Sequence, residues 1–130
     1  MELLEIPIKD PRSMGVKFSP QGALTLHGVS CDEDPKPLYQ KLKDWVKGYK
    51  DKPAEKTEFF IRLKYFNTSS ARCILELIQE LTPLSKTGKS LVVTWYYENG
   101  DEDMLETIRA FEELINHKIE PVVIESYSRG

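Results

Sequence analysis

Four consecutive residues, Asn67, Thr68, Ser69 and Ser70, bring one amide and three hydroxyls together directly after Tyr65-Phe66. Strand periodicity precedes this segment and helix periodicity follows it, so we expect a helix to begin here. The first N–H groups of a helix lack partners within the helix, and the helix dipole adds about half a positive charge at that end. The segment therefore has the chemistry of a helix cap or of a phosphate acceptor.

These two interpretations place different demands on the side chains. A capping oxygen accepts a hydrogen bond from a backbone N–H of the first turn. A phosphoacceptor must instead present a free hydroxyl, which a kinase loads with about two negative charges that the helix end tolerates. Local chemistry alone favours capping, because Asn, Ser and Thr are common capping residues.

The composition is that of one soluble globular domain. The chain has 130 residues, of which 40% are hydrophobic and 30% charged, and its formal net charge is −3. A general phosphate-backbone binder needs a basic stripe or field, so nucleic acid is not an expected partner.

The sequence predicts neither secretion nor membrane insertion. Residues 1–5 are too short and too acidic for a signal peptide, and no apolar run approaches the roughly 18 residues that span a bilayer. We expect a cytoplasmic protein in which Cys31 and Cys73 remain thiols.

The first part of the chain predicts a loosely ordered lead-in, a hairpin and a helix. Residues 1–13 form the lead-in to a single domain at 14–130. Residues 16–19 and 23–27 alternate apolar with polar on either side of Pro20-Gln21-Gly22, which predicts a hairpin. Residues 38–49 then repeat apolar side chains at steps of three and four, with lysines expected on the solvent face of the helix.

The remainder alternates strands with helices. Phe59, Ile61, Leu63 and Tyr65 predict the buried face of a strand. A helix is expected from residue 69 to about residue 87, a strand over 91–97, a third helix with Leu105, Ile108, Phe111 and Ile115 inward, and a last strand over 122–127 after Pro121.

The resulting order, β-β-α-β-α-β-α-β, predicts an α/β fold with a mixed sheet: an N-terminal antiparallel hairpin and a parallel remainder. The strand that carries Arg62 and Lys64 alternates, so we expect the helices to cover mainly one face. Right-handed crossovers on one face then place the strands in sequence order. Trp95 and Tyr97 should face the core, and Tyr96 should share the uncovered face with Arg62 and Lys64.

Several segments together resemble the SiaC family of bacterial regulatory phosphoproteins, which is related in fold to the STAS domains of anti-sigma-factor antagonists. The resemblance covers nearly the whole chain. It rests on Tyr65-Phe66-Asn67-Thr68-Ser69-Ser70 with Arg72, and on residues 24–28, Trp45, Tyr49, 92–97 and 101–106.

The resemblance implies a non-enzymatic partner switch. Thr68 matches the threonine that a cognate Ser/Thr kinase phosphorylates and a PP2C-type phosphatase dephosphorylates in that family. The unphosphorylated form is expected to bind a downstream target such as a diguanylate cyclase, which links the protein to cyclic-di-GMP signalling. Arg72, four residues after Thr68, is the expected local partner of the phosphate. Asn67, Ser69 and Ser70 are expected to serve as caps beside it, and the alternative for Ser69 and Ser70 is that they are secondary phosphate acceptors.

One loop departs from the family pattern. Members usually carry aromatic-Pro-Glu-Asn after the second strand of the hairpin, whereas this chain has Cys31-Asp32-Glu33-Asp34 and keeps only Glu33 in register. If this loop contacts a partner, the partner preference of this chain should differ.

The acidic run Asp101, Glu102 and Asp103 is expected to complement the dipole at the start of the third helix, and alternatively to form a contact surface near Thr68. A magnesium enzyme built on this run is the least favoured interpretation. The sequence shows no Gly-rich phosphate loop and no Ser-His-Asp order, so we expect no catalytic residues, metal or cofactor. The main competing hypothesis is a ligand-binding or scaffolding α/β module in which residues 67–70 only cap a helix.

Overall fold

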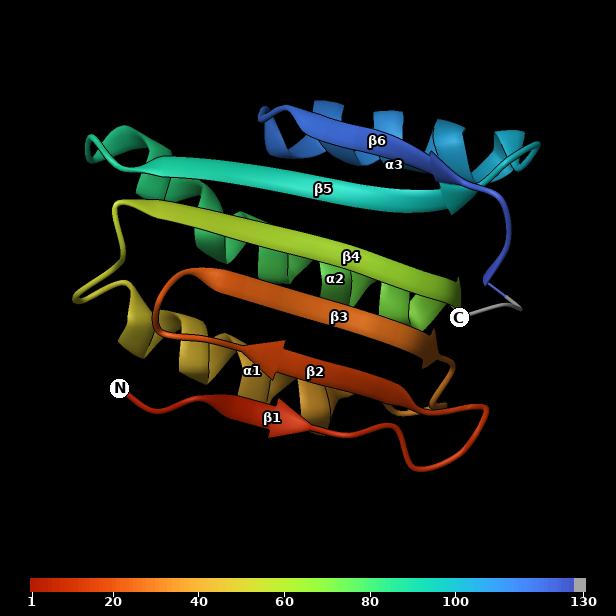
Figure 1. The fold of residues 1–130 in the computed structure, drawn as a ribbon, viewed down its shortest axis with the longest axis horizontal. Helices are drawn as coiled ribbons and strands as arrows, with labels where there is room; N and C mark the ends of the chain where they lie inside the picture. The colour runs from red at the N-terminus through yellow and green to blue at the C-terminus, as the bar shows by residue number, and fades with distance from the viewer. Residues whose placement is uncertain (128–130) are drawn as a thin grey trace.

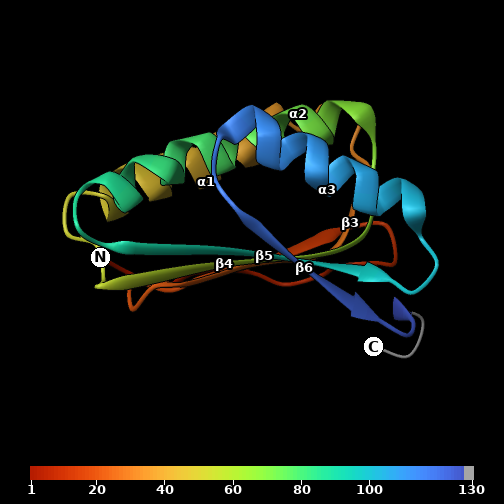
Figure 2. The ribbon, with the colours of Figure 1, turned by 90° about the horizontal axis from the view of Figure 1, so that it is seen from above.

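In the computed structural model, which describes residues 1–127, three α-helices lie on one face of a six-stranded sheet (Figures 1 and 2). The last three residues of the predicted domain, 128–130, lie outside this description. The helices are α1 (Lys36–Tyr49), α2 (Thr68–Leu81) and α3 (Glu102–Ile115), and a 3₁₀ helix, η1 (Thr82–Lys86), follows α2. The strands are β1 (Leu4–Ile6), β2 (Met14–Phe18), β3 (Ala23–Ser30), β4 (Lys56–Phe66), β5 (Ser90–Glu98) and β6 (Ile119–Ile124).

The strands follow one another across the sheet in sequence order, from β1 to β6. β1, β2 and β3 pair antiparallel, and β3 to β6 pair parallel. The predicted fold class is confirmed, and so is the expectation that the helices cover one face (Figure 2). As a result, α2 and α3 both begin beyond the carboxyl ends of parallel strands, at one edge of the sheet (Figure 1).

The N-terminal segment contributes a strand that the sequence prediction did not include. Leu4–Ile6 pair antiparallel with β2, with Leu4 opposite Phe18 and Ile6 opposite Val16. The Trp45 indole also donates a 3.0 Å hydrogen bond to the Glu2 carbonyl. Three residues are too few to show a strand period, so this edge strand depends on its neighbours rather than on its own pattern.

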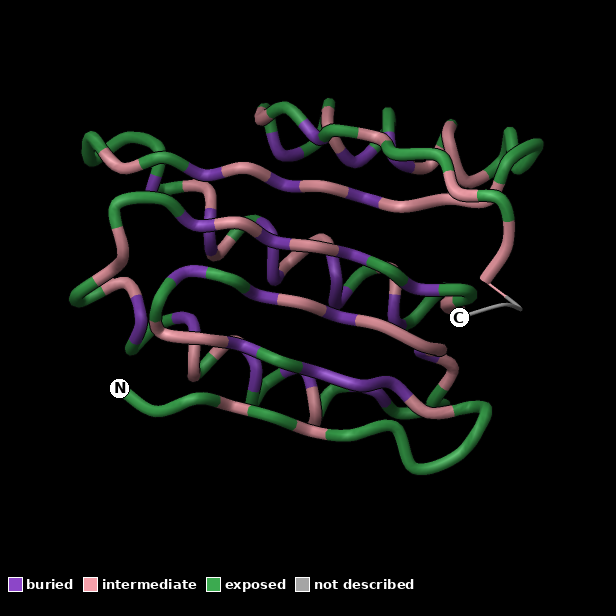
Figure 3. The backbone as a smooth tube through the Cα atoms, viewed as in Figure 1, coloured by how far each residue is buried: buried purple, intermediate pink, exposed green. Residues whose placement is uncertain are grey.

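The core lies between the sheet and the helices (Figure 3). Each helix buries one stripe, and the predicted inward residues Ile108, Phe111 and Ile115 are among the buried ones. Lys43 of α1 and Lys50, the residue directly after it, leave the predicted solvent face, because Lys43 pairs with Glu76 at 3.3 Å and Lys50 with Glu80 at 3.1 Å. These pairs join α1 to α2.

A bulge near the end of β4 changes which aromatic residue is buried. Gly28 of β3 lies opposite Leu63 but Val29 lies opposite Tyr65, so β4 carries one extra residue. Phe66 therefore packs against the core, 5.8 Å from the Trp95 ring, while Tyr65 is 54% exposed. The prediction that Tyr65 belongs to the buried face was wrong for this reason. Gly28 has a φ of +90°, which favours glycine.

The last strand begins earlier than predicted. β6 spans Ile119–Ile124, so Pro121 lies inside the strand, opposite Trp95. A proline is tolerated there because β6 is an edge strand with one unpaired side.

The uncovered face of the sheet carries the residues that alternation placed there. The Arg62 guanidinium lies 4.6 Å from the centre of the Tyr96 ring, as a cation–π contact. Trp95, by contrast, is fully buried on the helix side. Among residues 1–127, no helix is long and apolar enough to cross a membrane.

The bulge makes a test of the packing possible. Replacing Phe66 with Ala should lower the free energy of unfolding by about 2–3 kcal/mol, because it removes a ring packed on Trp95. Replacing the neighbouring exposed Tyr65 with Ala should change it by less than about 0.5 kcal/mol. Urea titrations of both variants measure this, and equal losses would contradict the shifted register.

Candidate functional site

The start of α2 is capped by Asn67. Its Oδ1 accepts a 2.8 Å hydrogen bond from the Ser70 backbone N–H, and its own backbone is extended. The expectation that Asn67 caps the helix is therefore confirmed. Ser69, which we also expected to cap, does not do so.

The same asparagine ties α2 to the loop after β3. Its Nδ2 donates to the Asp32 carbonyl at 3.0 Å, and its backbone N–H donates to the Ser30 carbonyl at 3.1 Å. The loop that departs from the family pattern is thus held against the start of α2.

Thr68 is the first residue of α2 and is exposed. Within residues 1–127 its hydroxyl has no hydrogen-bonding partner, since the capping position belongs to Asn67. Thr68 lines a groove of about 590 Å³ between α2 and α3, the α2–α3 groove, together with Arg72, Leu75 and Phe111. The hydroxyl is available to another protein.

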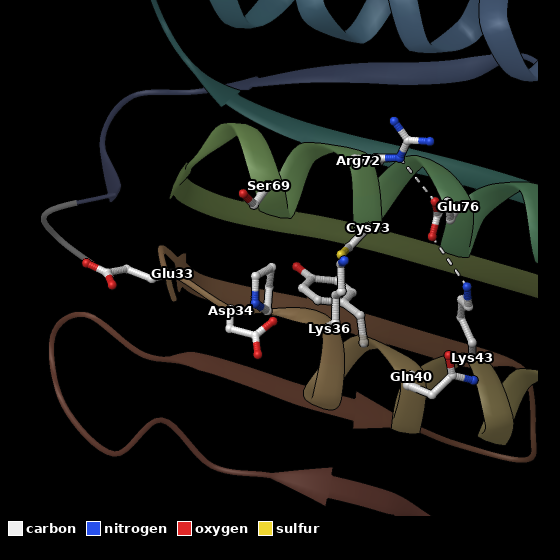
Figure 4. A pocket seen from close by; sticks show the side chains of 11 residues that line it. Glu33, Asp34, Lys36, Gln40, Lys43, Ser69, Arg72, Cys73 and Glu76 are labelled. Carbon is white, nitrogen blue, oxygen red and sulfur yellow. Dashed lines mark hydrogen bonds and ion pairs between the residues drawn. The ribbon is translucent and has the colours of Figure 1, made fainter.

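The two serines that follow have different environments. Ser69 is exposed and lies at the mouth of a second groove, of about 740 Å³, between α1 and α2 (Figure 4). Ser70 is fully buried, and its Oγ accepts a 2.8 Å hydrogen bond from the Ser30 hydroxyl. Ser30 and the Tyr39 hydroxyl are 2.9 Å apart, which extends this buried network to α1. The expected capping role of the Ser70 side chain was wrong, because its oxygen points inward.

The second groove, which we name the α1–α2 groove, mixes charges of both signs (Figure 4). Glu33 and Asp34 come from the loop after β3, and Lys36 begins α1. Cys73 lies at its base, where burial raises the pKa of the thiol and favours its neutral form. The remaining lining residues are Pro35, Tyr39, Gln40, Lys43, Ser69, Arg72 and Glu76.

Arg72 lines both grooves and already has an anionic partner. Its Nε lies 3.4 Å from Glu76 Oε2, and the other Glu76 oxygen lies 3.3 Å from the Lys43 ammonium. Thr68 and Arg72 share the α2–α3 groove, as their spacing of four predicted.

The acidic residues of α3 lie elsewhere. Asp101 caps the helix, with its Oδ1 accepting from the Met104 N–H at 3.0 Å, and Glu102 and Asp103 occupy the exposed first turn. The α2–α3 groove takes only Phe111 from α3, so these acids do not line the groove at Thr68. Among residues 1–127, no three His, Cys, Asp or Glu side chains are placed to hold one metal ion.

Sequence reasoning missed Ser30, Tyr39 and Glu76 as parts of this site. Ser30 matters through a hydrogen bond to Ser70, which lies 40 residues away, and Tyr39 matters through its contact with Ser30. No local sequence pattern predicts these contacts. The pairing of Glu76 with Arg72 could have been predicted, because Glu76 lies four residues after Arg72 on a predicted helix.

Comparison with known proteins gives a consistent result. The model of the SiaC family of regulatory phosphoproteins matches residues 10–124. An uncharacterized protein of Pseudomonas aeruginosa strain UCBPP-PA14 is 27% identical over 92 residues, which are 71% of this chain and 73% of that protein.

Solved structures from Pseudomonas aeruginosa share the fold. Apo-SiaC matches with a TM-score of 0.79 and 22% identity over 97% of this chain and all of that chain. A chain from the complex of the diguanylate cyclase SiaD with its activator SiaC matches with a TM-score of 0.81 and 22% identity, over 93% of this chain and 99% of that chain.

The cap assignment predicts unequal effects of two adjacent substitutions. Replacing Asn67 with Ala should lower the free energy of unfolding by about 1–2 kcal/mol, because both the cap and the tie to Asp32 are lost. Replacing Thr68 with Ala should change it by less than about 0.5 kcal/mol. Denaturant unfolding of both variants measures this; a larger loss for Thr68→Ala would show that Thr68 has a structural role.

The buried Tyr39 predicts a loss of stability in alkali. Burial raises the pKa of its hydroxyl above the ordinary value of about 10, so the folded state holds this proton more tightly than the unfolded state. The contribution of the neutral Tyr39 hydroxyl to the free energy of unfolding is complete below about pH 10 and is lost as the pH rises beyond it. The free energy of unfolding, measured by urea titration from about pH 8 to about pH 11, should fall less steeply for Tyr39→Phe than for the wild type. Parallel curves would contradict this.

Proposed function

Because this chain belongs to the SiaC family of regulatory phosphoproteins, we propose that it is a protein switch whose state is set by a phosphate on Thr68. A cognate Ser/Thr kinase adds the phosphate and a PP2C-type phosphatase removes it. The unphosphorylated form binds the downstream target. The chain itself needs no catalytic group for this role.

One observation carries the assignment to Thr68. The structural task at the start of α2 is performed by Asn67, whose oxygen caps the helix. Ser70 is buried and engaged with Ser30, which removes it from reach of a kinase. Thr68 and Ser69 are both exposed and both line the α2–α3 groove with Arg72, at the helix end that tolerates negative charge. Of these two hydroxyls, Thr68 is the one that matches the threonine of the family motif.

The proposed effect of the phosphate is electrostatic. About two negative charges would enter a groove whose other walls include Leu75 and Phe111. A partner packed on these apolar side chains would have to desolvate the phosphate, which is costly. Binding and phosphorylation therefore oppose each other.

We propose a diguanylate cyclase as the target, because SiaC of Pseudomonas aeruginosa is the activator of the diguanylate cyclase SiaD and shares this fold. The proposed contact surface is the exposed side of α2 with its two flanking grooves, extended by Glu33 in the loop after β3. Asp101, Glu102 and Asp103 form a second candidate contact beyond the same sheet edge.

Phosphorylation itself is tested with the cognate kinase and ATP. Intact-mass measurement should show one added phosphate on the wild type, and peptide mapping should place it on Thr68. Ser69→Ala, the matched control that removes the neighbouring exposed hydroxyl, should be modified normally, whereas Thr68→Ala should not. Full modification of Thr68→Ala would overturn the assignment.

Target binding is tested by calorimetric titration of the cyclase with each form. The unmodified protein and Thr68→Ala should bind alike, and the phosphorylated protein should bind at least about tenfold more weakly, or about 1.4 kcal/mol. Thr68→Asp should lie between them, because Asp carries less charge than phosphate. Equal binding by all forms would favour the scaffolding alternative.

A further inference from the structure

Arg72 has an acceptor position one turn away in each direction along α2. Thr68 lies four residues before it and Glu76 four residues after it, so all three lie on one stripe of the helix. In the unmodified protein the guanidinium is paired with Glu76, with 3.4 Å between Nε and Oε2 (Figure 4).

The Arg72–Glu76 pair is a weak one. The Arg72 side chain is 83% exposed and that of Glu76 is 41% exposed, so water screens their attraction. The order along the helix is also the less favourable one, because the cation precedes the anion and opposes the helix dipole.

Glu76 has a second and better-protected partner. Lys43 reaches across from α1, with 3.3 Å between its ammonium and Glu76 Oε1, and its side chain is only 24% exposed. Glu76 therefore remains paired with Lys43 when Arg72 leaves, and the release of Arg72 does not leave the Glu76 carboxylate without a partner.

We propose that Glu76 is a positioning residue that competes with the phosphate on Thr68 for the Arg72 guanidinium. Phosphorylation transfers Arg72 from Glu76 to the phosphate, while Glu76 stays with Lys43. This inference rests on the proposed function, because it takes Thr68 as the modified residue.

Several features favour the phosphate in this competition. It carries about twice the charge of a carboxylate and offers three acceptor oxygens. It lies at the positive end of the helix, and it precedes the arginine by four residues, which is the favourable order. Side chains on a helix also lean toward its N-terminus, so the Cα–Cβ direction of Arg72 favours Thr68 once the guanidinium leaves Glu76.

The transfer couples the two grooves that flank α2. Arg72 lines both the α2–α3 groove, which holds Thr68, and the α1–α2 groove. Its movement to the phosphate withdraws a cation from the α2 wall of the α1–α2 groove (Figure 4). The binding of a partner that contacts this wall through a carboxylate is then weakened without contact to the phosphate.

The phosphate reports this competition through its own second pKa, which is ordinarily about 6. Among the described residues that line the α2–α3 groove, Arg72 and Glu76 are the charged ones. Phosphorus-31 NMR titration of the protein carrying genetically encoded phosphothreonine at position 68 measures this pKa.

Two single variants give opposite expected shifts. Arg72→Gln should raise the phosphate pKa by about 0.5, because the favourable cation is lost. Glu76→Gln should lower it by about 0.3, because Arg72 is released to the phosphate. Glu80→Gln is the matched control: Glu80 lies one turn further along α2 and pairs with Lys50, so the pKa should not move.

The double variant Arg72→Gln/Glu76→Gln decides between competition and simple repulsion. If Glu76 acts through Arg72, its substitution should have no effect once Arg72 is absent. An equal lowering of the pKa with and without Arg72 would overturn the proposal, as would an unchanged pKa in Arg72→Gln. Because phosphothreonine is installed without a kinase, this result is separate from whether a kinase modifies Thr68, which mass mapping determines.

Discussion

The arrangement of the site depends on the two ends of one amide. The Asn67 oxygen satisfies the start of α2, and its nitrogen holds the loop after β3 through the Asp32 carbonyl. Because a single side chain performs both tasks, the helix start and the loop that carries Glu33 have a fixed relation. Because Asn67 caps α2, the Thr68 side chain is not needed as a cap, so a modification of Thr68 would add charge without disrupting the helix.

The one-sided layering determines where a partner finds features to contact. With every α-helix of the described chain on one face, the helices lie side by side (Figure 2), and one groove lies between α1 and α2 and another between α2 and α3. α2 is the middle helix and borders both grooves. A residue at its start therefore influences two surfaces, whereas the aromatic and basic residues of the uncovered face, such as Tyr96 and Arg62, are separated from them by the sheet.

The sequence was informative where local periodicity and tertiary packing agree. The alternation that places Trp95 in the core and Tyr96 on the uncovered face follows from strand geometry alone. The same alternation gave the wrong face for Tyr65, because a bulge is a property of two paired strands and shifts the period by one residue. The prediction for Ser70 failed for a similar reason, since only the fold reveals that Ser30 donates to its hydroxyl and that Tyr39 lies beside Ser30. The capping chemistry of Asn67 was readable because it is confined to four residues.

Pro121 affects how readily the edge strand β6 pairs with a strand of another molecule. The edge strand β6 carries two exposed valines, Val122 at 37% and Val123 at 52%, a composition that invites another chain to add a strand and begin aggregation. Proline offers no N–H, and Glu120 beside it adds charge, so the pair acts as a gatekeeper against cross-chain pairing. The exposed edge of the sheet is thereby protected against pairing with the same edge of another copy of the chain.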